Sequence, residues 1–293
     1  MVEAGCKEKK WNDTEDELPS EDDFEWGPPE ESALLTTGVC VLDQYKKHLV
    51  PVPGQTTVYS TISHQVIREV DSRQKTVSVD FTLTMRWYDP NIKAKFTDNE
   101  LEFLLTPTAT ESIWQPDMVI HNMTTFRAKE EWASLISAKV KKQPKTNVEM
   151  QYDLKATVYC HFEYSEYPMD TQNCNINIGS SSLAFKFALA STNAENDSET
   201  NVASNFRGKT TVFDNNRSTE SNTIGIKLDL SRIITPFLWK YYIPTTAIVL
   251  VSTISFVIPL TSVPGRVALL VTLFLTLINL FIYEMVSIDK FEK

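Results

Sequence analysis

The alternation of apolar and polar residues divides the chain into three parts. Between Thr56 and Leu230, several stretches alternate apolar and polar side chains and are rich in β-branched residues, which is typical of half-buried strands. The clearest are TVYSTISHQVIREV, TVSVDFTLTMRWY, YDLKATVYCHFEY and CNINIGS. Turn-like clusters such as DSRQK separate them, and no long helical pattern intervenes. This middle part is therefore predicted to form an antiparallel β-sandwich.

The part that precedes the strands contains two different segments. Residues 33–49 can form a short amphipathic helix, which Pro51, Pro53 and Gly54 would end. Residues 1–32 are polar and acidic without an apolar period, so they are predicted to be a disordered tail. They also contain no apolar run of the kind that marks a secretory signal peptide.

The part that follows the strands is strongly apolar. Twenty-five uncharged residues lie between Lys240 and Arg266, and seventeen more lie between Arg266 and Glu284. A helix of about 20 residues crosses the hydrocarbon core of a bilayer, which is about 30 Å thick. Two buried helices of a soluble core are the alternative, but globular helices are rarely apolar on all sides for this length. Two membrane-spanning helices are therefore predicted.

The second apolar segment carries one polar stripe. At about 100° per residue, Thr272, Thr276, Asn279 and Tyr283 fall within an arc of roughly 60°. Polar groups inside a bilayer face either a neighbouring helix or a water-filled path. Periodicity leaves both interpretations open, and a pore would require oligomerisation because one helix cannot enclose it.

Charge and motifs exclude several classes of function. The net charge is −10, and residues 1–32 alone contribute −9, so the rest of the chain is nearly neutral. Neither part offers the basic face that a nucleic-acid partner requires. No GxGxxG, GxxxxGK[ST], HExxH, GxSxG or CxxC motif is present, and the four histidines have no ligand spacing. We therefore expect no catalytic site, no metal and no cofactor.

Two of the four cysteines flank a turn. Cys160 and Cys174 enclose thirteen residues with a proline near the middle, which suits a disulfide across the end of a sheet. Two buried free thiols are the alternative, which a cytosolic location would favour. Cys6 and Cys40 are interpreted as unpaired.

This spacing, with Tyr167-Pro168-Met169-Asp170 inside it, resembles the signature loop of the Cys-loop (pentameric) ligand-gated ion channels. Further similar motifs follow the family's order over about residues 34–284. They are Trp87-Tyr88-Asp89, Trp114-Gln115-Pro116-Asp117, Leu230-Ser231-Arg232 and Val263-Pro264-Gly265-Arg266-Val267.

The resemblance implies an extracellular, immunoglobulin-like sandwich of about ten strands above a helical pore, with five subunits around an axis in the plasma membrane. The partners would be a small neurotransmitter-like agonist, held between adjacent sandwiches, other subunits of a homo- or hetero-pentamer, and membrane lipid. The Cys160–Cys174 loop would contact the membrane domain, where Pro168, Asp170 and Arg232 would couple binding to gating. The pore-lining residues would be Ala268, Thr272, Leu275 and Asn279.

For ion selectivity and agonist binding, fewer residues of this sequence match the family's motifs. By the resemblance, Pro264, Gly265 and Arg266 would stand at the inner end of the pore, and the absence of a carboxylate among them would favour anions such as chloride. The family's aromatic agonist cage is not assembled by the residues that match its motifs. The candidate ligand-binding residues are His121, Ser181, Phe206 and Phe213.

The expected organisation is a tail at 1–32, the extracellular sandwich at 33–234, two of the family's four membrane helices at 235–285, and a C-terminal tail at 286–293. Asn12, Asn122, Asn196 and Asn216 begin N-x-[ST] sequons, and the last three are the glycosylation candidates. The missing third and fourth helices suggest an alternative function, in which a truncated, non-conducting subunit acts as a membrane-tethered ligand-binding or dominant-negative regulatory protein.

Overall fold

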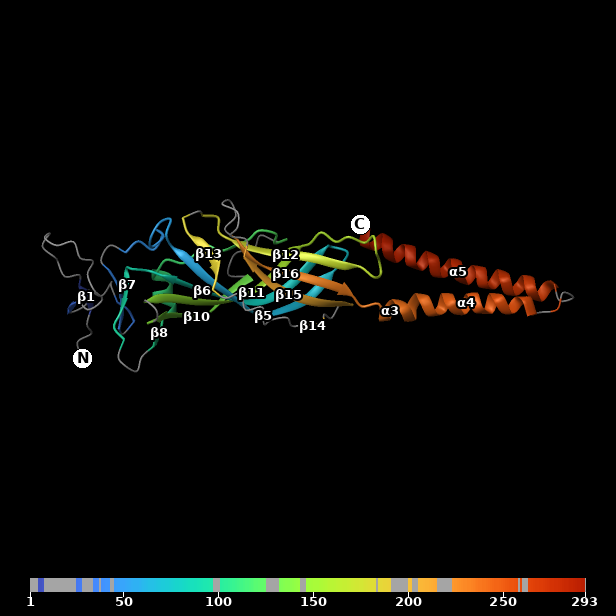
Figure 1. Cartoon of the computed structure of the whole chain (residues 1–293), viewed down its shortest axis with the longest axis horizontal. Coiled ribbons are helices and arrows are strands. Elements are labelled where there is room, and N and C mark those ends of the chain that lie inside the picture. Colours follow the sequence, from blue (N-terminus) through green and yellow to red (C-terminus); the bar gives the residue numbers. More distant parts are fainter. Residues whose placement is uncertain are drawn as a thin grey trace.

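The protein is an elongated molecule in the computed structural model, with a β-sandwich between an N-terminal segment and a pair of long helices (Figure 1). The structure describes residues 5–7, 25–27, 34–36, 38–42, 45–96, 101–124, 132–142, 146–182, 184–190, 200–201, 205–214, 223–257, 259 and 263–292. The last helix returns toward the sandwich, so the C-terminus lies near the junction between the two parts.

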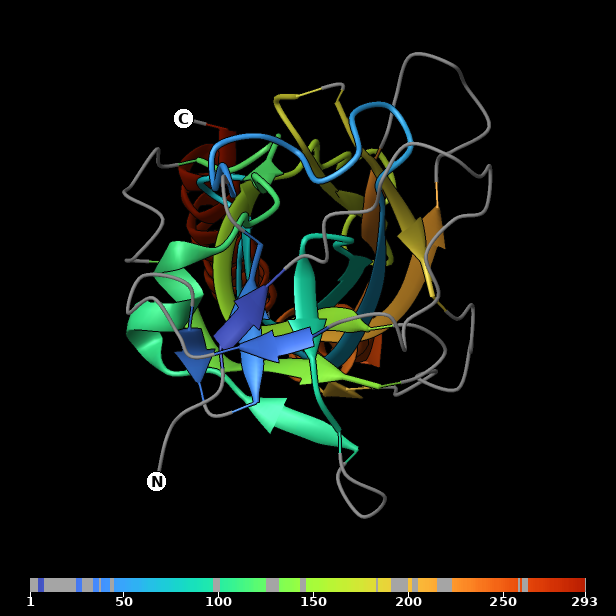
Figure 2. The ribbon, with the colours of Figure 1, turned by 90° about the vertical axis from the view of Figure 1, so that its left-hand side faces the viewer.

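Two sheets form the sandwich, and they curve around a common interior (Figure 2). The larger sheet has the order β13-β5-β6-β11-β10-β8 and the smaller has the order β14-β15-β16-β12-β9. The larger sheet contains β5 (Thr57–Asp71), β6 (Thr76–Tyr88), β8 (Glu102–Leu104), β10 (Ala133–Lys141), β11 (Asn147–Tyr159) and β13 (Lys186–Leu189). The smaller contains β9 (Val119–Ile120), β12 (Thr171–Gly179), β14 (Thr200–Asn201), β15 (Phe206–Asp214) and β16 (Ile224–Arg232). Neighbouring strands are antiparallel except for β13 and β5. The predicted sandwich is confirmed.

Alternating apolar side chains from both sheets fill the interior. In β6, for example, Val77, Val79, Phe81 and Leu83 are almost fully buried. An aromatic cluster continues this core toward the N-terminal end, where the rings of Trp87 and Trp114 meet edge to face at 5.6 Å and Trp114 meets Phe185 at 5.3 Å. Both tryptophans come from the sequence motifs, so these motif residues serve packing.

The helix predicted over residues 33–49 is wrong. Its described part contains β3 (Leu34–Thr36) and β4 (Val39–Val41), which form a small sheet with β7 (Ile92–Ala94). Gly38 adopts a φ of +89° between β3 and β4, which a helix cannot contain. The β-branched Val39 and Val41 then bury their side chains against the core.

Two predictions about the first forty residues also need correction. Residues 5–7 and 25–27 of the supposedly disordered tail form paired strands β1 (Gly5–Lys7) and β2 (Glu25–Gly27). They pair in antiparallel register, with Cys6 opposite Trp26. Cys40, predicted to be unpaired, is disulfide-bonded. Cys40 is fully buried. The side chain of Cys6 lies outside the described residues, as do Asn12, Asn196 and Asn216.

Tyr45 links the two tryptophan motifs. Its hydroxyl donates to the Asp89 carboxylate (2.8 Å) and accepts from the main-chain N–H of Trp114 (2.8 Å). Asp89 also accepts from the main-chain N–H of Asn91 (2.9 Å). Burial raises the pKa of both the Asp89 carboxyl and the Tyr45 hydroxyl. The turn after β6 is therefore tied to the segment that follows helix α1 (Pro107–Ser112).

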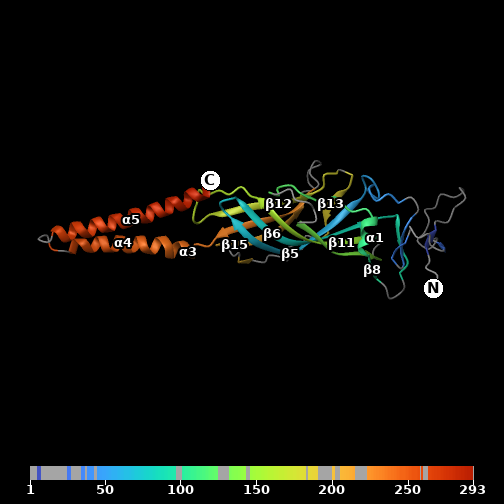
Figure 3. The ribbon, with the colours of Figure 1, turned by 180° about the vertical axis from the view of Figure 1, so that it is seen from behind.

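Two helices extend from the smaller sheet, side by side and antiparallel (Figure 3). The first comprises α3 (Thr235–Phe237), the π-helical turn η1 (Leu238–Tyr242), α4 (Ile243–Ile254) and the 3-10 turn η2 (Ser255–Val257). The second is α5 (Val263–Glu292). Thr235–Ile254 and Val263–Ile282 are long and apolar enough to cross a membrane, and they are not buried by the rest of the chain. The wide turn η1 precedes Pro244, whose ring would clash with the carbonyl of residue 240 in a regular α-helix.

We predict that Tyr45→Phe lowers the free energy of unfolding by about 2–3 kcal/mol, because the buried Asp89 carboxylate loses a donor and the Trp114 N–H loses an acceptor. Chemical unfolding of the purified chain measures the loss. Tyr59→Phe is the matched control, because the Tyr59 side chain is half exposed. Equal stability of the two variants would contradict the account.

Candidate functional site

An ion pair joins the tip of the Cys160–Cys174 loop to the last residue of β16. The Arg232 Nε and Nη2 atoms donate to Asp170 Oδ1 (2.6 Å) and Oδ2 (2.9 Å). The two side chains are 4% and 2% exposed. Gln172 Nε2 donates to Asp170 Oδ2 at 2.6 Å. This bidentate, buried geometry fixes the position of the loop relative to the strand that continues into the first apolar helix.

Aromatic rings surround the cation of this pair. The Arg232 guanidinium lies 4.4 Å from the ring centroid of Phe206 and 5.1 Å from that of Tyr167. Tyr167 in turn meets Phe237 of α3 edge to face at 5.4 Å. A chain of direct contacts therefore runs from the loop, through the ion pair, into the first turn of the helix.

The disulfide between Cys160 and Cys174 closes this loop, with a Cα–Cα distance of 5.4 Å. The closed loop also reaches the second helix, because Tyr167 and Pro168 line an apolar groove with Tyr242 of the π-turn and with Leu277 and Phe281 of α5. Pro168 and Asp170, both predicted to act in coupling, thus lie where the sandwich meets both helices.

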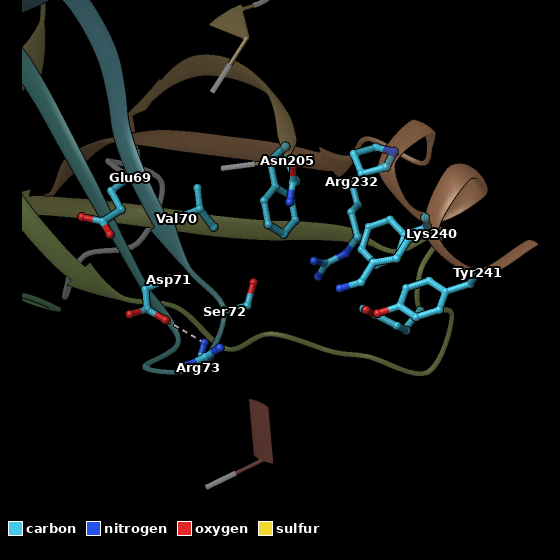
Figure 4. Close-up of a pocket in the computed structure, with 13 residues that line it drawn as sticks. Glu69, Val70, Asp71, Ser72, Arg73, Asn205, Arg232, Lys240 and Tyr241 are labelled. Atoms are coloured by element: carbon cyan, nitrogen blue, oxygen red, sulfur yellow. Dashed lines mark hydrogen bonds between the residues drawn. The ribbon is translucent and has the colours of Figure 1, made fainter. Parts of the chain in front are cut away.

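A pocket of about 360 Å³ opens beside the ion pair. Figure 4 shows Glu69 and Asp71 on the β5 side of this pocket and Lys240 and Tyr241 on the helix side, with Arg232 between them. The pocket lies between the β5–β6 turn and the first apolar helix. The β5–β6 turn is therefore, after the Cys160–Cys174 loop, a second part of the sandwich that faces this helix.

The Asp170 carboxyl is held in its charged form. Burial alone would raise its pKa, but the hydrogen bonds from Arg232 and Gln172 outweigh burial, so the pKa is below its usual value. Asp170 therefore carries a negative charge throughout the physiological range.

Three of the four candidate ligand-binding residues gather at the far end of the smaller sheet. Phe213 lies opposite Gly225 in the register, and Gly225 lies opposite Asn177. The main-chain N–H of His121 donates to the Asn177 carbonyl (3.0 Å), which continues the same row. Ser181 donates from its hydroxyl to the Asp117 carboxylate, which joins the loop before β9 to the loop after β12.

Two glycines lie beneath the rings of this row. A Cβ at Gly179 would approach His121 Nε2 to 2.6 Å, and a Cβ at Gly225 would approach Phe213 Cζ to 2.7 Å. The histidine and phenylalanine rings therefore lie against the sheet where neither glycine has a side chain. The outer face of the sheet becomes a floor with a ring at each side and polar groups from Ser181 and Asp117 beside it.

Phe206 does not belong to this group, which corrects its prediction as a ligand-binding residue. It lies at the opposite end of β15 from Phe213, seven residues and about 24 Å along the strand. Its buried ring packs under Arg232 instead. Aromatic character alone cannot tell these two positions apart.

The predicted pore residues form an exposed face of α5. Ala268, Thr272, Leu275 and Asn279 are all exposed, whereas Leu269, Leu273, Ile278 and Leu280 are partly covered. At about 100° per residue the four exposed residues fall within an arc of roughly 60°, and the partly covered residues lie outside it. The four predicted pore residues are therefore not covered by α4. At the N-terminal end of α5, Arg266 Nη2 donates to the Phe256 carbonyl (3.3 Å), and Pro264 and Gly265 are exposed.

The sequence matches a family model described as the neurotransmitter-gated ion-channel ligand binding domain over residues 37–232. This match covers the sandwich and ends at the arginine of the buried ion pair. The chain belongs to the neurotransmitter-gated ion-channel family. Members of this family are receptor subunits of the plasma membrane and not enzymes, and their ligand-binding domain is extracellular.

Similar proteins are subunits of anion-type receptors. The human gamma-aminobutyric acid receptor subunit rho-1 is 26% identical over 69% of this chain and 44% of its own length. The glutamate-gated chloride channel subunit beta of Haemonchus contortus is 26% identical over 81% of this chain and 59% of its own. The bovine gamma-aminobutyric acid receptor subunit pi is 24% identical over 84% and 57%, respectively. The chain thus spans about half the length of the relatives it matches.

Sequence reasoning missed three residues that the structure brings into these sites. Gln172 supports Asp170, and Tyr45 and Asn177 position the tryptophan motifs and the ring floor. Gln172 is the one with a detectable signal, because it is a polar residue at an inward position of β12. Tyr45 and Asn177 have no motif.

Asp170→Asn should lower the free energy of unfolding at neutral pH by about 3–5 kcal/mol, because it leaves the buried Arg232 charge without its partner. The lowered pKa sets the sign of the pH dependence. The native chain keeps this stabilisation above the ordinary Asp pKa of about 4 and loses it as the pH falls through the lower folded-state value. Unfolding measured from pH 7 to pH 3 should therefore show the gap between the native chain and the variant narrowing below about pH 4. A gap that widens in acid would contradict the assignment.

Alanine at three glycines should give graded effects on stability. At Gly225 the new Cβ meets the Ile176 carbonyl oxygen of the main chain, which cannot move aside, so the loss should reach or exceed the upper end of about 1–3 kcal/mol. At Gly179 the neighbours are side-chain atoms of His121 and Thr223, so the loss should be nearer the lower end. Gly265→Ala is the control, since no atom lies within 4 Å. Thermal unfolding in detergent measures the order, and equal losses at Gly179 and Gly225 would refute the account of the floor.

Proposed function

We propose that this chain is a subunit of a neurotransmitter-gated anion channel, in which agonist binding at the outer face of the smaller sheet opens a pore lined by α5. The observation that carries the proposal is the buried Asp170–Arg232 pair. It ties the disulfide-closed loop of a ligand-binding sandwich to the strand that continues into a membrane helix. A receptor that only captured ligand would gain nothing from this connection.

The agonist site is proposed to lie between neighbouring subunits. His121, Ser181 and Phe213 would be the face that this chain contributes, with Asp117 held beside Ser181. This face offers two rings and a carboxylate, a combination that suits a small amine-bearing neurotransmitter. The names of the relatives make gamma-aminobutyric acid and glutamate the first agonists to test.

The gating path is proposed to follow the contacts already described. Movement of β15 and β16 at the agonist end would reach Arg232 at their membrane end, because both strands pair along their full length. Arg232 contacts Tyr167 and Phe237, so a shift there displaces the first helix and the loop tip together. Pro168 lies against the same groove as Leu277 and Phe281 of α5, which brings the movement to the pore helix.

Five copies of α5, from this chain alone or with other subunits, are proposed to enclose the pore. The stripe of Ala268, Thr272, Leu275 and Asn279 is free of α4 and would face the lumen. Leu275 would form the hydrophobic constriction, and a ring of Arg266 side chains at the inner end would attract anions.

Whole-cell recording tests the proposal. Cells that express the chain, alone and together with the rho-1 subunit, receive gamma-aminobutyric acid or glutamate. We expect an agonist-evoked current whose reversal potential follows the chloride gradient, and Arg266→Glu should move it toward the cation gradient. A native current that follows sodium would refute anion selectivity. No current from the chain expressed alone, with the chain at the cell surface and the rho-1 current reduced by co-expression, would favour the non-conducting regulatory subunit instead.

A further inference from the structure

The sequon Asn122-Met123-Thr124 lies where the chain passes from one sheet of the sandwich to the other. Before it, β9 pairs with β12 of the smaller sheet, with Ile120 opposite Ile178. After it, Met123 forms a bridge with Val158 of β11 in the larger sheet. The Thr124 N–H donates to the Thr157 carbonyl (3.0 Å), which continues this second pairing. Asn122 is therefore the residue at which the chain changes sheets.

Leaving a sheet exposes the edge that the chain no longer pairs. The last main-chain bond on β12 is from the His121 N–H to the Asn177 carbonyl (3.0 Å). Beyond it, the Asn177 N–H and the Asn175 carbonyl have no further β9 residue to pair with. Asn177 is half-buried and Asn175 is exposed, and a main-chain group that is shielded from water costs free energy unless another group satisfies it.

The Asn122 side chain supplies both missing partners. Its Nδ2 donates to the Asn175 carbonyl at 2.7 Å, and its Oδ1 accepts from the Asn177 N–H at 3.4 Å. The same Nδ2 reaches the Tyr159 carbonyl of β11 at 3.4 Å, while the Asn122 carbonyl accepts from the Tyr159 N–H at 2.9 Å. One amide thus continues the ladder of the smaller sheet while its main chain pairs with the larger one.

Thr124, the threonine of the sequon, also bonds to the larger sheet. Its hydroxyl donates to the Thr157 carbonyl at 3.1 Å. Transfer of a glycan replaces one hydrogen on Nδ2 with a bulky sugar, and this nitrogen donates to carbonyl oxygens on two different sheets. A glycan at Asn122 would therefore remove at least one of these two hydrogen bonds and place a sugar between the amide and a strand.

We propose that Asn122 is an inter-sheet clip that stays unglycosylated, and that it holds His121 in place over Gly179. His121 immediately precedes the clip, and its ring lies against the position where Gly179 lacks a side chain. The role of this position in agonist binding rests on the proposed function. The inter-sheet contacts of Asn122 and the absence of a glycan there are independent of the proposed function.

The first test is glycopeptide mass spectrometry of the full chain, expressed in animal cells and purified in detergent. Deglycosylation in H₂¹⁸O labels each asparagine that carried a glycan. We expect no label at Asn122 in the folded, monodisperse protein. A label on most of the folded molecules would overturn the proposal.

The second test separates the donor role of the amide from its shape. Asn122→Asp keeps the size and the Oδ1 acceptor but places a carboxylate oxygen against the Asn175 carbonyl. We expect it to lower the melting temperature by about 5 °C or more, at least as much as Asn122→Ala. Asn173→Ala, at an exposed position of the same strand β12, is the matched control and should change it by about 1 °C or less. An Asn122→Asp variant as stable as the native chain would overturn the clip.

The third test reports the position of His121 without any agonist. Diethyl pyrocarbonate modifies accessible histidines, and His161 of the same chain is the internal reference. Asn122→Asp should raise the modification rate of His121 relative to His161 at least twofold, below the melting temperature of the variant. An unchanged ratio would show that the clip stabilises the sandwich without positioning His121 and would overturn that half of the proposal. Because no channel current is measured, failure of the proposed function would leave all three results unaffected.

Discussion

The rest of the structure depends on one buried ion pair, between Asp170 and Arg232, at the boundary of two different environments. The sandwich is stabilised by the burial of apolar side chains away from water, whereas the helices are apolar on their outer faces and long enough to cross a membrane. Among the described residues, the buried core lies within the sandwich and does not extend into the helices. The bidentate pair, with Phe206, Tyr167 and Phe237 around the guanidinium, is the main connection between them. Its cost in desolvation is offset by geometry and by the hydrogen bond from Gln172.

The candidate agonist floor lies at the other end of the strands that carry this pair. The floor depends on missing side chains as much as on those present, because Gly179 and Gly225 leave room for the rings of His121 and Phe213. Arg232 ends β16 at the membrane side, and Gly225 lies near the start of the same strand. One continuous strand therefore spans the distance between the floor and the ion pair, which gives the proposed gating path a rigid element.

Strands and membrane helices could be predicted from the sequence because their hydrophobic periods are long. The predicted stretch TVSVDFTLTMRWY is β6 residue for residue. Local departures from these periods could not be predicted from the sequence. In β5, a bulge with His64 at a φ of +50° turns Gln65 inward and leaves Val66 exposed, the reverse of what polarity suggests. The segment around Val39 has a helical period but pairs with β7, a contact between residues 51 to 55 positions apart that no local pattern contains. Among the site residues, Asp170 and Arg232 came from motifs, whereas the separation of Phe206 from Phe213 required the register of β15.

The central claim is that the ion pair transmits agonist binding to the membrane helices. A double-mutant cycle on agonist-evoked current tests it most directly, with Asp170→Asn, Arg232→Gln and the double variant compared at equal surface expression. The account predicts strong non-additivity, in which each single change raises the half-maximal agonist concentration and the double variant is no worse than the more affected single one. Additive effects of the two changes would contradict it.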